Sequence, residues 1–163
     1  MPAEDIKVLP LTPGPLVLVV DDKATVRSRI ARWVDALGYQ ARSCRSGPAA
    51  LRFLKAHPRE VRLLLTDLAM PGMDGGELIE RAKDLDPTLI TMLMAGPEDQ
   101  SAGELLYGYR DVPFVPKPVN FADLAEKLEL LLGIPATPTR PLPSMKTRSR
   151  KRHRRSSGHH RVE

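Results

Sequence analysis

The sequence predicts an α/β fold, a doubly wound parallel sheet of five strands with helices on both faces. Two observations support this prediction. Short apolar runs alternate with amphipathic segments in five successive strand-then-helix units within residues 15–133, and such alternation is typical of a parallel sheet. The first run, residues 16–20, is continuously apolar, as expected of a strand buried on both faces.

The first half of the domain contains three strands and the helices between them. Residues 16–20 form the first strand, and a helix follows from about residue 23 until Gly38 stops it. Residues 39–44 form a weaker strand. Pro48 starts a second helix, which ends before Pro58. The third strand covers residues 61–66.

The second half repeats the pattern with weaker signals. A helix opens at Gly75, and a strand covers residues 88–95. Residues 98–110 are expected to form a marginal, mobile helix because they contain two glycines. Residues 112–116 form an edge strand, since their two prolines cannot serve a central ladder. The last helix is capped by Asn120 and ended by Gly133.

The two ends of the chain are expected to lie outside this domain. Residues 1–14 form a loose arm with three prolines, residues 15–133 form the domain, and residues 134–163 form a disordered basic tail. The net charge of +5 divides unevenly. Residues 136–163 hold nine Lys or Arg and one Glu, net +8, whereas the other residues hold 16 basic and 19 acidic side chains, net −3. The tail could bind nucleic acid through its cluster of cations, which are Arg148, Arg150, Lys151, Arg152, Arg154 and Arg155.

Composition narrows the class of protein further. The 163 residues, 42% of them hydrophobic, suffice for one core. The single cysteine, Cys44, excludes an internal disulfide and fits a reducing compartment. No apolar stretch reaches the length of a membrane span, and the first residues do not resemble a signal peptide. We therefore expect a cytoplasmic protein without a membrane partner.

Charged side chains follow three of the predicted strands. Asp21 and Asp22 end the first strand, Asp67 ends the third, and Lys117 ends the fifth. The carboxyl ends of parallel strands share one edge, where ligands bind in open α/β sheets. Clustered carboxylates favour Mg²⁺, a lysine suits an incoming phosphoryl group, and an aspartate can act as its nucleophile. The alternative is that each aspartate only caps the helix after its strand.

These motifs resemble a known family. The chain carries, in this order, an Asp-Asp pair, an Asp followed by Leu-Ala-Met-Pro-Gly-Met-Asp-Gly, and a late Lys-Pro. This order of motifs resembles the receiver domain of bacterial two-component response regulators. The resemblance covers about residues 15–133 and implies a flavodoxin-like (CheY-like) sheet in the order 2-1-3-4-5. It implies that Asp67 is the phospho-acceptor and that the Lys117–Pro118 peptide is a cis candidate. It also implies a site for Mg²⁺, which Asp22 would bind directly and Asp21 through water. Asp67 and the backbone carbonyl of Ala69 would be the other protein ligands of the metal. Lys117 and the backbone N–H of Ala95 would contact the phosphoryl group.

One position departs from the family pattern. Met94 stands where the family carries a Ser or Thr, whose hydroxyl contacts the phosphoryl group and starts the switch, and Phe114 stands at the second switch position. Met94 has no hydrogen-bond donor. We therefore expect phosphorylation to persist and the response of residues 98–132 to be weak. In the competing interpretation, Met94 packs against Phe114 and holds the active arrangement permanently.

The resulting functional hypothesis is a stand-alone response regulator, charged by a histidine kinase or phosphotransfer protein, that contacts a downstream protein through residues 98–132. The resemblance implies no enzyme activity beyond self-phosphorylation and self-dephosphorylation. A phosphohydrolase with an aspartate nucleophile is a rival, but it needs an acid two residues later, where Ala69 stands. A receiver-like scaffold, or a nucleic-acid binder acting through the tail, is the other alternative. The sequence leaves homodimerisation open.

Overall fold

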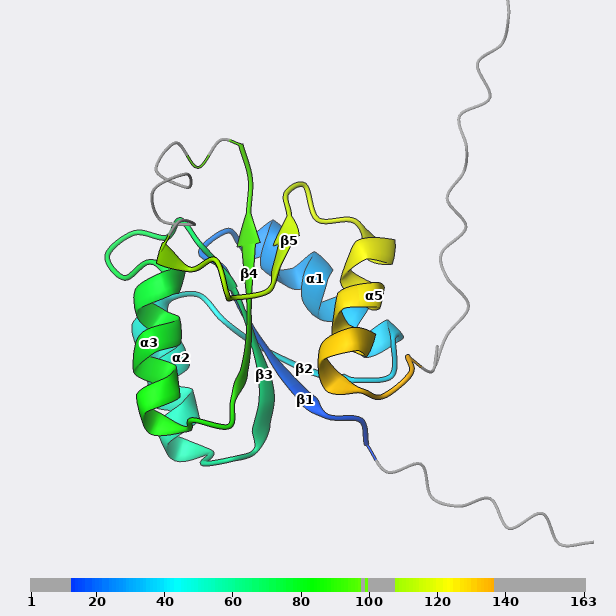
Figure 1. Cartoon of the computed structure of the whole chain (residues 1–163), viewed down its shortest axis with the longest axis horizontal. Helices are drawn as coiled ribbons and strands as arrows, with labels where there is room; N and C mark the ends of the chain where they lie inside the picture. Colours follow the sequence, from blue (N-terminus) through cyan, green and yellow to red (C-terminus); the bar gives the residue numbers. More distant parts are fainter. Residues whose placement is uncertain (1–12, 98, 100–107, 137–163) are drawn as a thin grey trace, which may run out of the picture.

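A single parallel sheet organises the molecule, which a computed structural model describes over residues 13–97, 99 and 108–136 (Figure 1). The strands are β1 (Leu16–Val20), β2 (Gln40–Cys44), β3 (Val61–Asp67), β4 (Ile90–Ala95) and β5 (Phe114–Pro116). The helices are α1 (Ala24–Ala36), α2 (Gly47–Ala56), α3 (Gly75–Leu85) and α5 (Phe121–Leu132). The sheet order is β2-β1-β3-β4-β5, with every pair parallel. The predicted fold class and strand order are thus confirmed.

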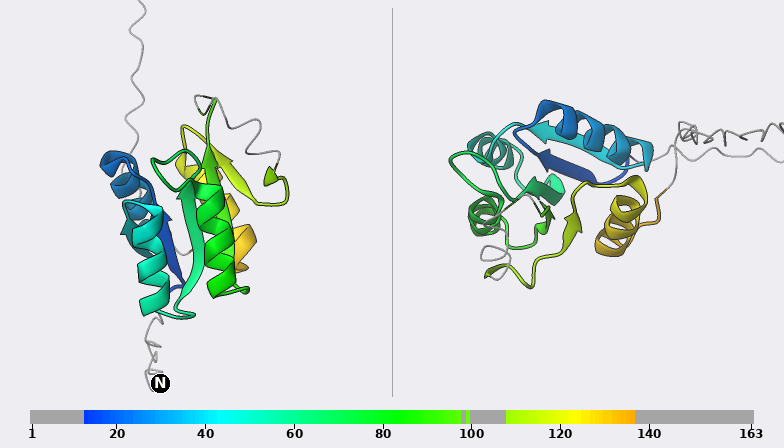
Figure 2. Two further views of the ribbon diagram at one scale, coloured as in Figure 1. Left: turned by 90° about the vertical axis from the view of Figure 1, so that its left-hand side faces the viewer. Right: turned by 90° about the horizontal axis from the view of Figure 1, so that it is seen from above.

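The helices form two layers on opposite faces of the sheet. Helices α1 and α5 cover one face and α2 and α3 cover the other, as the view from above shows (Figure 2). Side chains alternate between the faces along each strand. In β1, Val17 and Val19 join the core under α1 and α5, whereas Leu18 and Val20 join the core under α2 and α3. This burial on both faces explains why the first strand is continuously apolar.

Each helix starts or stops where the local chemistry requires it. Side chains of Ser46, Asp74 and Asn120 accept a hydrogen bond from the backbone three residues later, which caps α2, α3 and α5. Gly133 ends α5 in the left-handed conformation, with a φ of 65°. The N-cap of α1 is Lys23, whose side chain makes no capping bond. The interpretation of the strand-end aspartates as helix caps is therefore wrong.

Several strand boundaries differ from the prediction, two of them because of short turns. Strand β4 begins at Ile90, not residue 88, because Thr88 donates from its backbone N and Oγ1 to Oδ1 of Asp86, at 2.9 and 2.6 Å. Strand β5 begins at Phe114, not residue 112, since the N–H of Val112 closes a turn onto the carbonyl of Tyr109. Strand β3 includes Asp67 itself.

Several predictions fall on residues that the structure does not describe. The expected helix at 98–110 is described only at residues 99 and 108–110, the first arm only from residue 13, and the tail only at residues 134–136. Those last residues contact the domain: the hydroxyl of Tyr39 donates to the carbonyl of Ile134 at 2.8 Å, and the N–H of Ala136 donates to Oε1 of Glu129 at 2.9 Å. Within the described residues, no helix is both long and apolar enough to cross a membrane.

Candidate functional site

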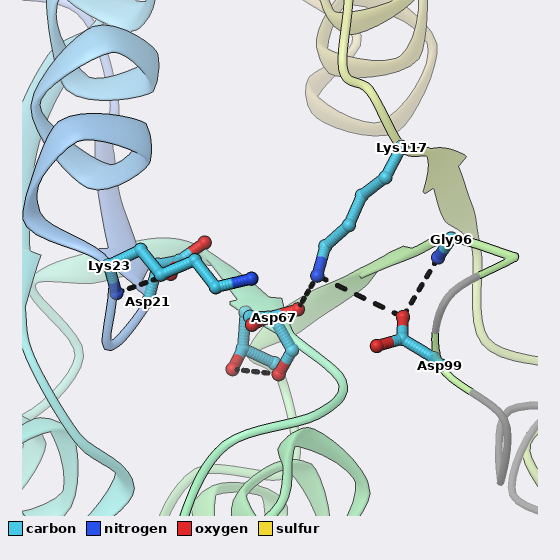
Figure 3. A network of polar contacts seen from close by, with 7 residues as sticks. Asp21, Lys23, Asp67, Gly96, Asp99 and Lys117 are labelled. Atoms are coloured by element: carbon cyan, nitrogen blue, oxygen red, sulfur yellow. Dashed lines mark hydrogen bonds and ion pairs between the residues drawn. The ribbon is translucent and has the colours of Figure 1, made fainter.

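The candidate site lies at the carboxyl edge of the sheet, where backbone hydrogen bonds hold the strand ends together. The N–H of Leu68, just after β3, donates to the carbonyl of Met94 at 3.0 Å, and the N–H of Lys117, just after β5, donates to that of Ala95 at 2.8 Å. Strand β1 lies beside β3, with Val20 paired with Thr66. The ends of β1, β3 and β5 thus bring Asp21, Asp67 and Lys117 together in one pocket (Figure 3). The Lys117–Pro118 peptide is cis, as the family resemblance implies.

Three carboxylates meet in this pocket. One oxygen from each of Asp21, Asp22 and Asp67 lies within 4.8 Å of the others. Asp21 and Asp67 are buried, whereas Asp22 is exposed. Oδ1 of Asp21 accepts from the N–H of Lys23 at 2.8 Å, but Oδ2 of Asp21 and Oδ2 of Asp67 are buried without a hydrogen-bond partner among the described residues. Carboxylate oxygens are the ligands that a hard divalent cation such as Mg²⁺ prefers, and a bound cation would give these buried oxygens a partner.

Lys117 supplies the positive charge of the pocket. Its Nζ forms an ion pair with Oδ1 of Asp67, and the two side chains are only 11% and 1% exposed. Burial raises the pKa of Asp67 above its ordinary value, although the bond from Lys117 opposes this effect. Burial also raises the pKa of Asp21. Burial alone would lower the pKa of Lys117, but the bond to Asp67 and the charges of Asp67, Asp99 and Asp21 outweigh it and raise the pKa. Lys117 therefore keeps its charge.

The Gly-rich turn after β3 lets α3 approach the buried aspartate. A Cβ added at Gly75 would lie 2.2 Å from the carbonyl oxygen of Asp67, so only glycine fits there. The N–H of Gly75 donates to the carbonyl of Leu68 at 2.8 Å. Ala69, whose carbonyl is the expected further metal ligand, is exposed in this turn.

A fourth carboxylate reaches the pocket, and the sequence reasoning missed it. Oδ2 of Asp99 lies 3.8 Å from Nζ of Lys117 and accepts from the N–H of Gly96 at 2.9 Å (Figure 3). Asp99 comes four residues after the end of β4. An acidic residue soon after a strand end is the signal that identified Asp67, and it could have identified Asp99, which was instead assigned to the expected helix at 98–110.

The two expected switch residues lie on opposite faces of the sheet. Met94 pairs with Asp67 on β3 and with Val115 on β5, and it is buried in the core under α1 and α5. Phe114 pairs with Leu93, whose side chain faces the other core, and Phe114 is 46% exposed. Since paired residues of parallel strands share a face, the interpretation in which Met94 packs against Phe114 is wrong. Met94 instead places an apolar side chain directly beside Asp67.

The six candidate nucleic-acid-binding cations of the basic tail lie outside the described residues.

Comparison with known proteins assigns the family. A model of the response regulator receiver domain matches residues 17–129. The chain belongs to the response regulator receiver family. Receiver domains work in two-component phosphorelays as signalling modules, so the chain is a response regulator protein of that kind, and the scaffold and nucleic-acid alternatives are not favoured.

Individual relatives agree with this assignment. The response regulator receiver protein CpdR of Brucella abortus is 31% identical over 116 residues, which cover 71% of this chain and 95% of CpdR. The sensor kinase CckA of the same organism is 27% identical over 126 residues, 77% of this chain but 13% of CckA. A crystal structure of the receiver domain of the hybrid histidine kinase CckA superimposes with a TM-score of 0.60 at 31% identity, covering 72% of this chain and 98% of that domain.

Proposed function

We propose that Asp67 is the residue that accepts the phosphoryl group, from a phosphohistidine of a histidine kinase or phosphotransfer protein. The observation that carries the proposal is the ion pair between Lys117 and a buried Asp67, beside the other two carboxylates of the pocket. A carboxylate in such a site is a nucleophile of the kind that forms aspartyl phosphates. The alternative acceptors, Asp21 and Asp22, lack a direct ion pair to Lys117 among the described contacts.

The proposed step is a transfer between two side chains. An oxygen of the Asp67 carboxylate attacks phosphorus and forms a P–O bond, while the P–N bond breaks and its electron pair returns to the imidazole nitrogen of the donor. Lys117 neutralises the charge on the phosphoryl oxygens, which is the principal task of a protein in phosphoryl transfer. The backbone N–H of Ala95, at the end of β4, would donate to the same group.

Mg²⁺ is the proposed cofactor. Asp22 would bind it directly, Asp21 through water, and Asp67 and the carbonyl of Ala69 would complete the protein ligands. Bound there, the cation would offset the repulsion among the carboxylates and the incoming phosphoryl group. The buried oxygens of Asp21 and Asp67 without hydrogen-bond partners support this assignment.

The proposed output is contact with a downstream protein through residues 98–132. Two apolar side chains in the described part of this surface support it: Phe114 on β5 and Leu130 on α5, 46% and 74% exposed. Homodimerisation, a cytoplasmic location and nucleic-acid binding by the tail stay predictions.

Intact mass spectrometry tests the proposal. Wild-type protein incubated with acetyl phosphate and Mg²⁺ should gain one phosphoryl group, and Asp67→Asn should gain none. Asp22→Ala should weaken Mg²⁺ binding more than Asp21→Ala does, because only Asp22 is expected to bind directly. Phosphorylation of Asp67→Asn, or equal phosphorylation of the wild type in EDTA, would contradict the assignment.

A further inference from the structure

Asp99 contributes a negative charge to the pocket that the proposed phosphoryl transfer does not use. Its side chain is only 7% exposed, and it stands across Lys117 from Asp67 (Figure 3). The ammonium of Lys117 therefore lies between two carboxylates, in close contact with Asp67 and at 3.8 Å from Oδ2 of Asp99. At 3.8 Å the Asp99 contact is an ion pair and not a hydrogen bond, so it is the weaker of the two.

Asp99 is tied to the end of β4 by two hydrogen bonds to Gly96. The N–H of Gly96 donates to Oδ2 of Asp99 at 2.9 Å, and the N–H of Asp99 donates to the carbonyl of Gly96 at 3.1 Å. The carboxylate oxygen that faces Lys117 is the same one that accepts from Gly96. Withdrawal of this oxygen from Lys117 therefore disturbs the acceptor of the Gly96 N–H, which makes the Gly96 amide a reporter of Asp99.

Phosphorylation changes the charge balance around Lys117. A phosphoryl group carries close to two negative charges at neutral pH and three strong acceptor oxygens. A lysine ammonium is a compact charge, and like charges brought together in a desolvated site repel strongly. A phosphoryl group on Asp67 and the carboxylate of Asp99 would compete for the same ammonium.

We propose that Asp99 is an internal competitor for Lys117, which opposes phosphorylation of Asp67 and is displaced from Lys117 and Gly96 when the phosphoryl group arrives. The proposal rests on the proposed function of Asp67. Phosphorylation would then change the conformation at the end of β4, although Met94 offers no hydroxyl to the phosphoryl group. The displacement is driven by charge, because the phosphorylated state disfavours Asp99 beside Lys117 and the unphosphorylated state favours it.

Asp99→Asn separates charge from shape, since the asparagine amide oxygen can still accept from the N–H of Gly96. Asp84→Asn is the matched control, because Asp84 is exposed near the end of α3, at the opposite edge of the sheet from the pocket. In the full-length protein with Mg²⁺, the initial rate of phosphorylation by acetyl phosphate, read by intact mass, should rise about fivefold in Asp99→Asn, a change of roughly 1 kcal/mol in the barrier. Asp84→Asn should match the wild type.

Backbone amide NMR gives the second readout. Addition of beryllium fluoride, a phosphoryl mimic, should shift the Gly96 resonance strongly in the wild type and in Asp84→Asn, and less than half as much in Asp99→Asn, whose neutral side chain is not repelled. Equal phosphorylation rates in Asp99→Asn and Asp84→Asn, or an equal Gly96 shift in both, would overturn the proposed role of Asp99 and leave the proposed function of Asp67 standing. Absence of phosphorylation in the wild type and in both variants would overturn the proposed function of Asp67, and the role of Asp99 with it.

Discussion

The two halves of the pocket are built differently. The carboxylate side, formed by Asp21, Asp22 and Asp67 after β1 and β3, places acidic oxygens within 4.8 Å of one another. The response side, formed by Met94, Asp99 and Lys117 around the ends of β4 and β5, combines a buried apolar side chain, a carboxylate and a cation. The carboxylate side matches what the family resemblance implies, and the response side departs from it at Met94. Lys117 joins the two sides through its contacts with Asp67 and Asp99, whereas Met94 can be altered without changing any of the three carboxylates.

The largest loss of stability is expected at Gly75, where α3 packs against the backbone of Asp67 on the carboxylate side. Gly75→Ala would push a methyl group into the carbonyl of Asp67, and such overpacking should lower the free energy of unfolding by roughly 2–3 kcal/mol. Urea unfolding measures this. Gly108→Ala is the matched control, because a Cβ there meets nothing within 4 Å, and it should change stability little. Similar losses in both variants would mean that the close approach of α3 does not position Asp67.

Met94→Thr tests the response side. A threonine hydroxyl beside Asp67 could donate to the phosphoryl group, and a hydrogen bond to a charged group is worth about 1.5–3 kcal/mol. We expect beryllium fluoride to shift the amide resonances of β5 and α5 more in Met94→Thr than in the wild type. Met92→Thr is the control, since Met92 is also buried in the core under α1 and α5 but pairs with Leu65, away from the strand end. Shifts as large in the wild type as in Met94→Thr would contradict weak coupling.

On the carboxylate side, Asp21→Asn should change how the stability of the protein depends on pH. Because burial raises the pKa of Asp21, the folded state binds more protons than the unfolded state above the ordinary value of 3.8, and stability without Mg²⁺ falls as the pH rises from there. Asp21→Asn removes this loss. The substitution should raise the free energy of unfolding by about 1 kcal/mol at neutral pH, which is the lower end of the cost of an unsatisfied buried acceptor. The gain in free energy should be smaller near pH 3.8.

Urea unfolding in EDTA at the two pH values measures this difference. An equal gain at both would show that the charge of Asp21 is not its cause. Added Mg²⁺ should stabilise the wild type more than Asp21→Asn, because the wild type has the full set of carboxylates.

The smallest effect is expected outside both sides of the pocket, in the tail. The cations at 148–155 should bind polyanions without sequence preference, each neutralised phosphate adding roughly −0.7 to −0.9 to the slope of log affinity against log salt. The comparison is between the full chain and a chain ending at Ala136, because Ile134 and Ala136 contact the domain. Equal, weak DNA binding by both would remove a nucleic-acid role.

The amino-acid sequence alone predicts the sheet and the place of Asp67, the proposed acceptor. Alternating apolar and amphipathic segments depend on periodicity, which is a local property of the chain, and the strand-end positions of Asp21, Asp67 and Lys117 follow from the same pattern. The strand order needed the family resemblance, since no local feature states which strand lies beside which. Element boundaries at Thr88 and Val112 were displaced because short turns competed with the strands.

Which side chains meet across the pocket depends on how distant segments pack against one another. The position of Asp99 beside Lys117 depends on hydrogen bonds to Gly96 at the end of β4, and a helical assignment of residues 98–110 gave no reason to look there. Met94 and Phe114 looked like partners in sequence, yet the register of β4 against β5 puts them on opposite faces. Register and turn geometry are set by packing between segments distant in the chain, and a one-residue shift would reverse every face. For this reason the place of Asp67 at a strand end was predictable from the sequence, and the contact between Asp99 and Lys117 was not.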